Sequence, residues 1–67
     1  MKVFAVIKRG SIARIQRAMG LNIAGNTIDE LHVELDPQHL HRGYYPKNNP
    51  GTNFDLTTAT ERLIVQA

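Results

Sequence analysis

The part of this chain richest in reactive side chains is His39–Asn49, which holds two histidines, an arginine, a lysine and two adjacent tyrosines. One residue separates His39 from His41, so on an extended backbone both imidazole rings would point to the same side. Asp36 could add an oxygen ligand, and imidazole with carboxylate is a donor set that suits zinc. The sequence nearby supplies no fourth ligand, and we therefore predict that these histidines are exposed loop residues without a metal.

The residues His39, Leu40 and His41 resemble the histidine pair of the HUH endonucleases, which also use a catalytic tyrosine. The resemblance implies metal-dependent nuclease chemistry, with Tyr44 or Tyr45 in the place of that tyrosine. It covers three residues of this chain. In that family the pair lies on a central strand of a larger domain and the tyrosine lies on a separate helix, whereas here all of them fall in one short segment. We rank nuclease chemistry third among the candidate functions.

Four side chains of the same segment belong to types that favour macromolecular contacts: Arg42, Tyr44, Tyr45 and Lys47. Arginine and tyrosine bury a large area at low cost in conformational entropy and keep a polar group for hydrogen bonding. The same residues could instead stack on nucleic-acid bases and contact phosphates. Alternatively, one tyrosine covers the edge of the sheet and the other is exposed without a binding role.

Enzyme signatures are missing from the sequence. It has no glycine-rich phosphate-binding loop, and its only serine, Ser11, is placed to cap a helix. Asp29 and Glu30 are adjacent, so on a strand they would point to opposite faces and could not act as a paired acid and base. A chain of 67 residues is also short for a substrate cavity of about 300 Å³ or more. We therefore expect neither catalysis nor a cofactor.

Charge is distributed unevenly along the chain. Residues 1–28 contain five basic residues and no acidic one, and residues 29–36 contain four acidic residues, although the net charge is only +2. We expect Arg9, Arg14 and Arg17 to contact a partner that carries its own charge pattern. Alternatively, the basic and acidic zones neutralise each other within the fold.

Length and composition indicate one small domain over residues 1–67. A chain of this size buries only about 60% of its unfolded surface, so homodimerisation would be a source of additional burial. Cysteine is absent, which excludes disulfides and thiolate zinc sites and fits a reducing compartment. No apolar run approaches the roughly 20 residues that a membrane-spanning helix needs. We expect a cytoplasmic protein, inside the host cell if it is viral, with no membrane partner.

Periodicity predicts the strands and the helix that would position these side chains. Val3–Ile7 is rich in β-branched and aromatic residues, which predicts a strand buried on both faces. Alternating apolar residues over 31–35 predict a half-exposed strand, and residues 62–66 predict a final strand beside the first. Ser11 and Gly20 fit the two ends of a helix. Its apolar face would consist of Ile12, Ile15, Ala18 and Met19.

Residues 21–30 allow two interpretations. Gly25 and Asn26 would suit a two-residue hairpin turn, whereas Thr27 and Glu30 would suit a capping box that starts a second helix. With a second helix, residues 12–31 would resemble a helix-turn-helix motif. The segment from Gly20 to Thr27 is, however, about twice as long as the three- or four-residue turn of that motif.

Together these patterns predict an α+β fold in the order β-α-(β or α)-β-loop-β. An antiparallel or mixed sheet of three to four strands would carry one main helix on one face, with an irregular loop at about 37–53. The favoured function is a non-enzymatic binding module that docks on a larger protein or nucleoprotein complex and inhibits or modulates it, as small regulators of phages and mobile elements do. A nucleic-acid-binding regulator that uses the same residues is the second hypothesis.

Overall fold

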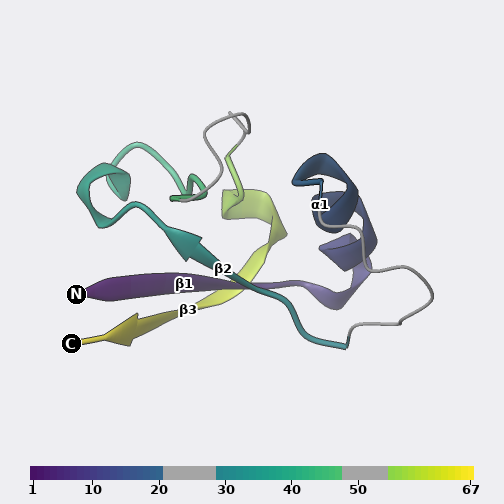
Figure 1. The fold of residues 1–67 in the computed structure, drawn as a ribbon, viewed down its shortest axis with the longest axis horizontal. Coiled ribbons are helices and arrows are strands. Elements are labelled where there is room, and N and C mark those ends of the chain that lie inside the picture. The colour runs from purple at the N-terminus through teal and green to yellow at the C-terminus, as the bar shows by residue number, and fades with distance from the viewer. Residues whose placement is uncertain (21–28, 48–54) are drawn as a thin grey trace.

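Three antiparallel strands form the centre of the computed structural model, which describes residues 1–20, 29–47 and 55–67 (Figure 1). β1 (Lys2–Ile7) lies between β2 (His32–Leu35) and β3 (Thr60–Gln66). The α+β fold with a small antiparallel sheet is thus confirmed, and so is the pairing of the final strand with the first. The central position suits β1, because its β-branched residues favour strands and two neighbours shield them.

One face of the sheet carries the hydrophobic core. Val3 pairs with Leu35 on β2, and Ala5 pairs with Val33, so these four side chains share this face. Helical segments pack on it from one side, as Figure 1 shows for α1 and for the 3₁₀ helix Thr57–Ala59. The buried residues of the core cluster are Val3, Ala5, Ile7, Ile12, Ile15, Val33, Leu35, Leu56 and Ala59.

The opposite face of the sheet is open within the described part of the chain (Figure 1). Val6 points to this face and is nevertheless only 4% exposed. Its cross-strand neighbours are His32 on β2 and Arg62 on β3. Both reach the same oxygen of Glu30, at 3.0 Å from His32 Nε2 and 3.7 Å from Arg62 Nη2. The predicted burial of β1 on both faces therefore holds for Val6, whereas Phe4 on the same face is half-buried.

The helix α1 (Ile12–Ala18) follows a 3₁₀ helix at Arg9–Ser11. Ser11 occupies the predicted N-cap position, but its hydroxyl makes no capping hydrogen bond. Gly20 has a φ of +69°, the left-handed conformation typical of the residue that follows a helix.

The apolar face of α1 differs from the prediction at one position. Ile12 and Ile15 are buried and Met19 packs against the core, but Ala18 is exposed. A turn of 100° per residue places Ala18 about 90° from the centre of the face that the other three form, which explains the error.

The predicted irregular loop at 37–53 has local structure in its described part. Pro37–His39 forms a 3₁₀ helix, and Pro46 makes a β-bridge with Leu35 on β2. The two alternatives for residues 21–28, a hairpin turn or a second helix, lie outside the described residues. No helix within the described ranges has the length and apolar character needed to cross a membrane.

Candidate protein-binding loop

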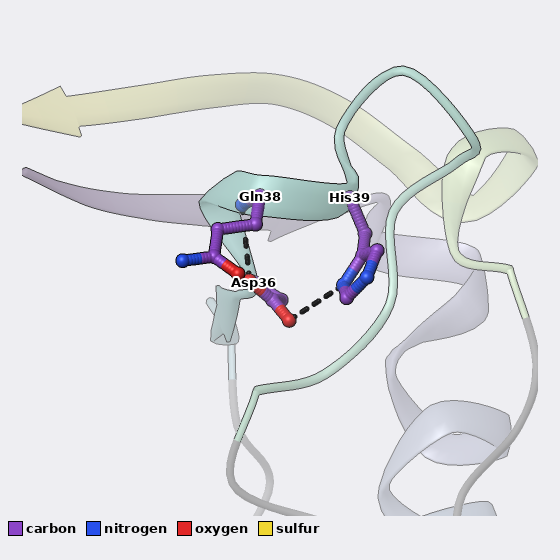
Figure 2. A network of polar contacts seen from close by, with 3 residues as sticks. All are labelled: Asp36, Gln38 and His39. Atoms are coloured by element: carbon purple, nitrogen blue, oxygen red, sulfur yellow. Dashed lines mark hydrogen bonds and ion pairs between the residues drawn. The ribbon is translucent and has the colours of Figure 1, made fainter.

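The segment of residues 36–47, here called the binding loop, begins with a capped turn. Asp36 accepts a hydrogen bond from the backbone N–H of Gln38 at 3.0 Å, and its other carboxylate oxygen lies 2.7 Å from Nδ1 of His39 (Figure 2). Pro37 occupies the first position of the 3₁₀ helix, where its fixed φ is favourable and no N–H is needed. The Gln38 N–H and then His39 hold the pKa of Asp36 below its ordinary value.

The histidine pair does not have the extended backbone that the metal alternative requires. His39 ends the 3₁₀ helix and His41 lies in the turn that follows, so the two are not on an extended backbone with their rings on one side. The proline and the Asp36 cap favour a helical turn over a strand at this point. His41 is exposed, and His39 already contacts Asp36. Within the described ranges, no group of three His, Asp or Glu side chains lies close enough to hold a metal ion.

The end of the binding loop is attached to β2 through its backbone. Asp36 N–H donates to the carbonyl of Tyr45 at 3.2 Å, and Lys47 N–H donates to the carbonyl of Glu34 at 2.9 Å. Residues 45–47 therefore run along the outer edge of β2 in antiparallel fashion, on both sides of the bridge at Pro46. This arrangement satisfies backbone groups that an exposed strand edge would leave without partners.

A second attachment joins the loop to the segment before β3. Asp55 accepts a hydrogen bond from Tyr44 N–H at 2.8 Å, and Leu56 N–H donates to the carbonyl of Tyr44, also at 2.8 Å. The same Asp55 oxygen accepts from the backbone N–H of Thr57 at 2.9 Å and from its hydroxyl. The hydroxyl of Thr57, followed by the N–H groups of Tyr44 and Thr57, lowers the pKa of Asp55. The carboxylate is charged at neutral pH, and this charge strengthens its hydrogen bonds.

Gly43 is required where the chain approaches Asp55. Its φ is +142°, a conformation that favours glycine. A Cβ built on Gly43 would lie 2.7 Å from Oδ2 of Asp55, closer than nonbonded atoms approach each other. The turn at residue 43 and the position of the Asp55 carboxylate therefore depend on each other.

The four loop residues predicted to bind a partner lie in different environments. Arg42 is exposed and forms no ion pair with any described residue. Tyr45 is half-buried, and Tyr44 is half-buried with its side chain packed against the core. Lys47 Nζ lies 3.6 Å from the carboxylate of Glu34. Arg42 and Tyr45 are thus the two residues of this set whose side chains show neither an ion pair nor packing against the core cluster among the described residues.

The three arginines predicted from the basic half lie on or beside α1. Arg14 and Arg17 are exposed and form no ion pair with the described residues, whereas Arg9 lies 3.9 Å from Asp29. Arg14 also borders a groove of about 310 Å³ between α1 and the segment 55–59. α1 and residues 37–42 lie towards opposite ends of the molecule, with the 3₁₀ helix Thr57–Ala59 between them (Figure 1). The predicted residues therefore form two zones on the side of the sheet that carries the core.

Several residues of the acidic zone pair with side chains that lie outside the basic zone. Glu30 lies beside His32 and Arg62, and Glu34 lies beside Lys47. The Arg9–Asp29 contact joins the basic zone of residues 1–28 to the acidic zone. Both side chains of this pair are exposed, so it contributes little to stability.

Asp55, which holds the loop, was not singled out from the sequence. The pattern Asp55-Leu56-Thr57 carries a detectable signal, because an aspartate often accepts a hydrogen bond from the backbone two residues later. Nothing in the sequence indicates the contact with Tyr44, which is 11 residues away.

Comparison with known proteins does not place this chain in a family. No protein-family model matches the chain, and no curated protein or solved structure matches it significantly.

Proposed function

We propose that this chain is a non-enzymatic binding module that docks on a larger protein or nucleoprotein complex in the cytoplasm and inhibits or modulates it. The observation that carries the proposal is the attachment of the binding loop at both of its ends. Asp36 closes its first turn, and Asp55 together with the edge of β2 holds residues 44–47. Arg42 lies between these attachments and is exposed, and Tyr45 lies at the second attachment, where it is half-buried.

Attachment of the loop lowers the entropic cost of binding. A loop that is already ordered loses less conformational freedom when a partner docks, so more of the contact energy appears as affinity. Arginine and tyrosine are the types that concentrate binding energy at interfaces. This combination supports recognition of a protein surface by Arg42 and Tyr45.

The state of the carboxylates supports a non-enzymatic role. A general acid or base works best with a pKa near the operating pH. The carboxyl groups of Asp36 and Asp55 instead have a pKa below the ordinary value, and both accept backbone hydrogen bonds that hold the loop. Their role is structural.

The α1 arginines support electrostatic guidance of the partner. Arg14 and Arg17 are exposed on one helix and form no ion pair with the described residues. Complementary charge raises association rates and discriminates between partners. The same observation favours a second candidate function, binding of nucleic acid, in which these arginines contact phosphates.

Affinity capture from the native host tests the proposal. The immobilised wild type and the Arg42→Ala/Tyr45→Ala double variant are compared, with His41→Ala as a control, because His41 is an exposed residue of the same loop. We expect a macromolecule that is captured by the wild type and by His41→Ala and is lost with the double variant. Equal capture by all three proteins would refute a role for the loop.

Salt dependence separates the two candidate functions. Binding to random-sequence DNA or RNA at about 50 mM salt that weakens steeply as salt rises would favour nucleic acid. In that case Arg14→Gln/Arg17→Gln should reduce the slope by roughly two units, since each arginine would displace about one counterion. Absence of nucleic-acid binding under these conditions leaves the protein-docking proposal.

A further inference from the structure

The two outer edges of the sheet differ in how they are protected. On β2, residues 45–47 cover the outer edge through the Tyr45 and Lys47 backbone hydrogen bonds and the bridge at Pro46. On β3, no described segment pairs with the outer edge, because β3 is last in the order β2-β1-β3. β3 has seven residues, so it presents a long row of backbone groups that a further strand could satisfy.

The second half of β3 lacks the usual protection of an edge strand. Natural edge strands carry proline or charged residues, contain a β-bulge, or are very short. β3 reads TERLIVQ: its first half has Glu61, Arg62 and a register shift against β1, whereas three consecutive apolar residues and a glutamine follow. Val65 is 61% exposed, and Leu63 and Ile64 are half-buried. An apolar strand edge of this kind fits an extended strand of matching apolar character.

We propose that β3 pairs with β3 of a second copy of this chain, antiparallel and about a two-fold axis at Ile64. The two sheets would join into one continuous antiparallel sheet of six strands. This inference does not depend on the proposed function, because the binding loop lies beyond β2, on the other side of β1.

The symmetry of such a pair restricts its register. Residues directly opposite each other in an antiparallel pair point to the same face. The two-fold axis must therefore lie midway between the two copies of one residue, which then face each other; an axis at a residue is meant in this sense. An axis at Glu61 or Arg62 would place like charges directly opposite each other, which is destabilising. An axis at Leu63 would place Arg62 opposite Ile64 of the second copy, and an axis at Val65 would place Ile64 opposite Gln66. These registers are therefore disfavoured.

An axis at Ile64 matches residues of similar character. Ile64 lies opposite its own copy, Leu63 lies opposite Val65, and Arg62 lies opposite Gln66. Within each chain Ile64 also pairs with Phe4 on β1, and both are half-buried on the open face. The two Phe4–Ile64 pairs would then form one continuous apolar row across the joined sheet, in which each isoleucine covers the other. Self-complementarity at Ile64 is what selects a second copy as the occupant of this edge.

The dimer is expected to be weak and to depend on concentration. Pairing of two short strands buries less than the roughly 1,200 Å² of stable interfaces, so it belongs to the transient class. The binding loop and α1 of each copy would stay accessible, and two linked copies would bind a repetitive partner more tightly than one copy does.

Cysteine cross-linking tests the register directly, because the chain contains no cysteine. Directly opposed residues have Cα atoms about 4.5–5.5 Å apart, within the range of a disulfide. In the proposed register Ile64→Cys faces its own copy, whereas two Val65→Cys residues would lie roughly 8 Å apart, beyond that range. We expect a covalent dimer with Ile64→Cys under mild oxidation and little with Val65→Cys. Since Val65 is the more exposed residue, cross-linking controlled by exposure alone would favour Val65→Cys and would overturn the proposal.

Charged substitutions of Ile64 provide a second test. Ile64→Lys and Ile64→Glu should each lose the self-association that sedimentation detects for the wild type at high concentration, because like charges would face each other. A mixture of the two variants should restore a dimer that contains one copy of each. Circular dichroism of each variant confirms that the monomer is folded. A wild type that remains monomeric at millimolar concentration, or a folded Ile64→Lys variant that associates as the wild type does, would refute the proposal.

Discussion

Asp55 accepts a hydrogen bond from the backbone N–H of Tyr44 at 2.8 Å and so joins two segments that are 11 residues apart in the chain. The return bond from Leu56 N–H to the carbonyl of Tyr44 places Leu56 at the core, where its side chain is fully buried. One carboxylate thus positions a residue of the binding loop and a residue of the core together. The stability of the loop and of the fold should therefore change together when this contact is altered.

Replacement of Asp55 by alanine should lower the free energy of unfolding by about 1–2 kcal/mol. This is the range for hydrogen bonds to a charged group, reduced because Asp55 is exposed to solvent. The midpoint of urea unfolding measures the change. Asp29→Ala is the matched control, since the one contact of its carboxylate seen among the described residues is the long one with Arg9, at 3.9 Å. An equal effect of both substitutions would contradict the role given to Asp55.

Substitution of Gly43 by alanine should be more harmful than substitution of Gly10. Alanine at Gly43 must adopt a φ of +142° and bring its Cβ to 2.7 Å from the Asp55 carboxylate. We expect a loss of about 1–3 kcal/mol, the cost of a strained backbone conformation. A Cβ at Gly10 meets no atom within 4 Å and has no positive φ to adopt, so Gly10→Ala should leave stability nearly unchanged. Similar unfolding midpoints for the two variants would show that the turn at Gly43 relaxes without cost.

The strands and the helix were predictable from the sequence because their signals are local. Alternation of apolar residues defines β2, and β-branched content defines β1 and β3. Gly20 adopts the conformation expected at a helix end for a reason intrinsic to glycine. The exposure of Ala18 was also open to prediction, because its helical angle places it about 90° from the centre of the apolar face.

The candidate site was less predictable because long-range contacts determine it. Arginine and tyrosine are residue types that suit binding, which points to Arg42 and Tyr45. Which loop side chains instead stabilise the fold is determined by contacts that only the structure shows. Tyr44 packs on the core and Lys47 lies beside Glu34, and neither contact has a sequence signal. The histidine pair does not lie on an extended backbone, because the Asp36 cap and Pro37 favour a helical turn.

Leu56→Ala should be the most destabilising of the single substitutions proposed for this fold. Leu56 is fully buried although it lies in a short irregular segment before β3. Truncation of a buried leucine costs about 2–5 kcal/mol, which is comparable to the total stability of a small domain. Thr58→Ala, an exposed position two residues later, is the control and should change stability by less than about 0.5 kcal/mol. A cooperative unfolding transition at the wild-type urea midpoint in Leu56→Ala would show that this segment does not contribute to the core.

Acid should weaken the fold through Asp36 and Asp55, which hold the loop, and through Glu30, which pairs with His32 and Arg62. The pKa is lowered for Asp36 and Asp55, whose ordinary value is 3.8, and for Glu30, whose ordinary value is 4.5. In each case the folded state binds a proton less readily than the unfolded chain does, so the contribution to stability is complete above the ordinary pKa. It is lost as the pH falls through the lowered folded-state pKa. Urea unfolding between pH 7 and pH 2 should therefore show stability that falls only below about pH 4.5. Asp55→Asn removes one of the three groups, and its stability should fall less over the same range. A variant that loses as much stability as the wild type would show that Asp55 does not contribute to the acid sensitivity.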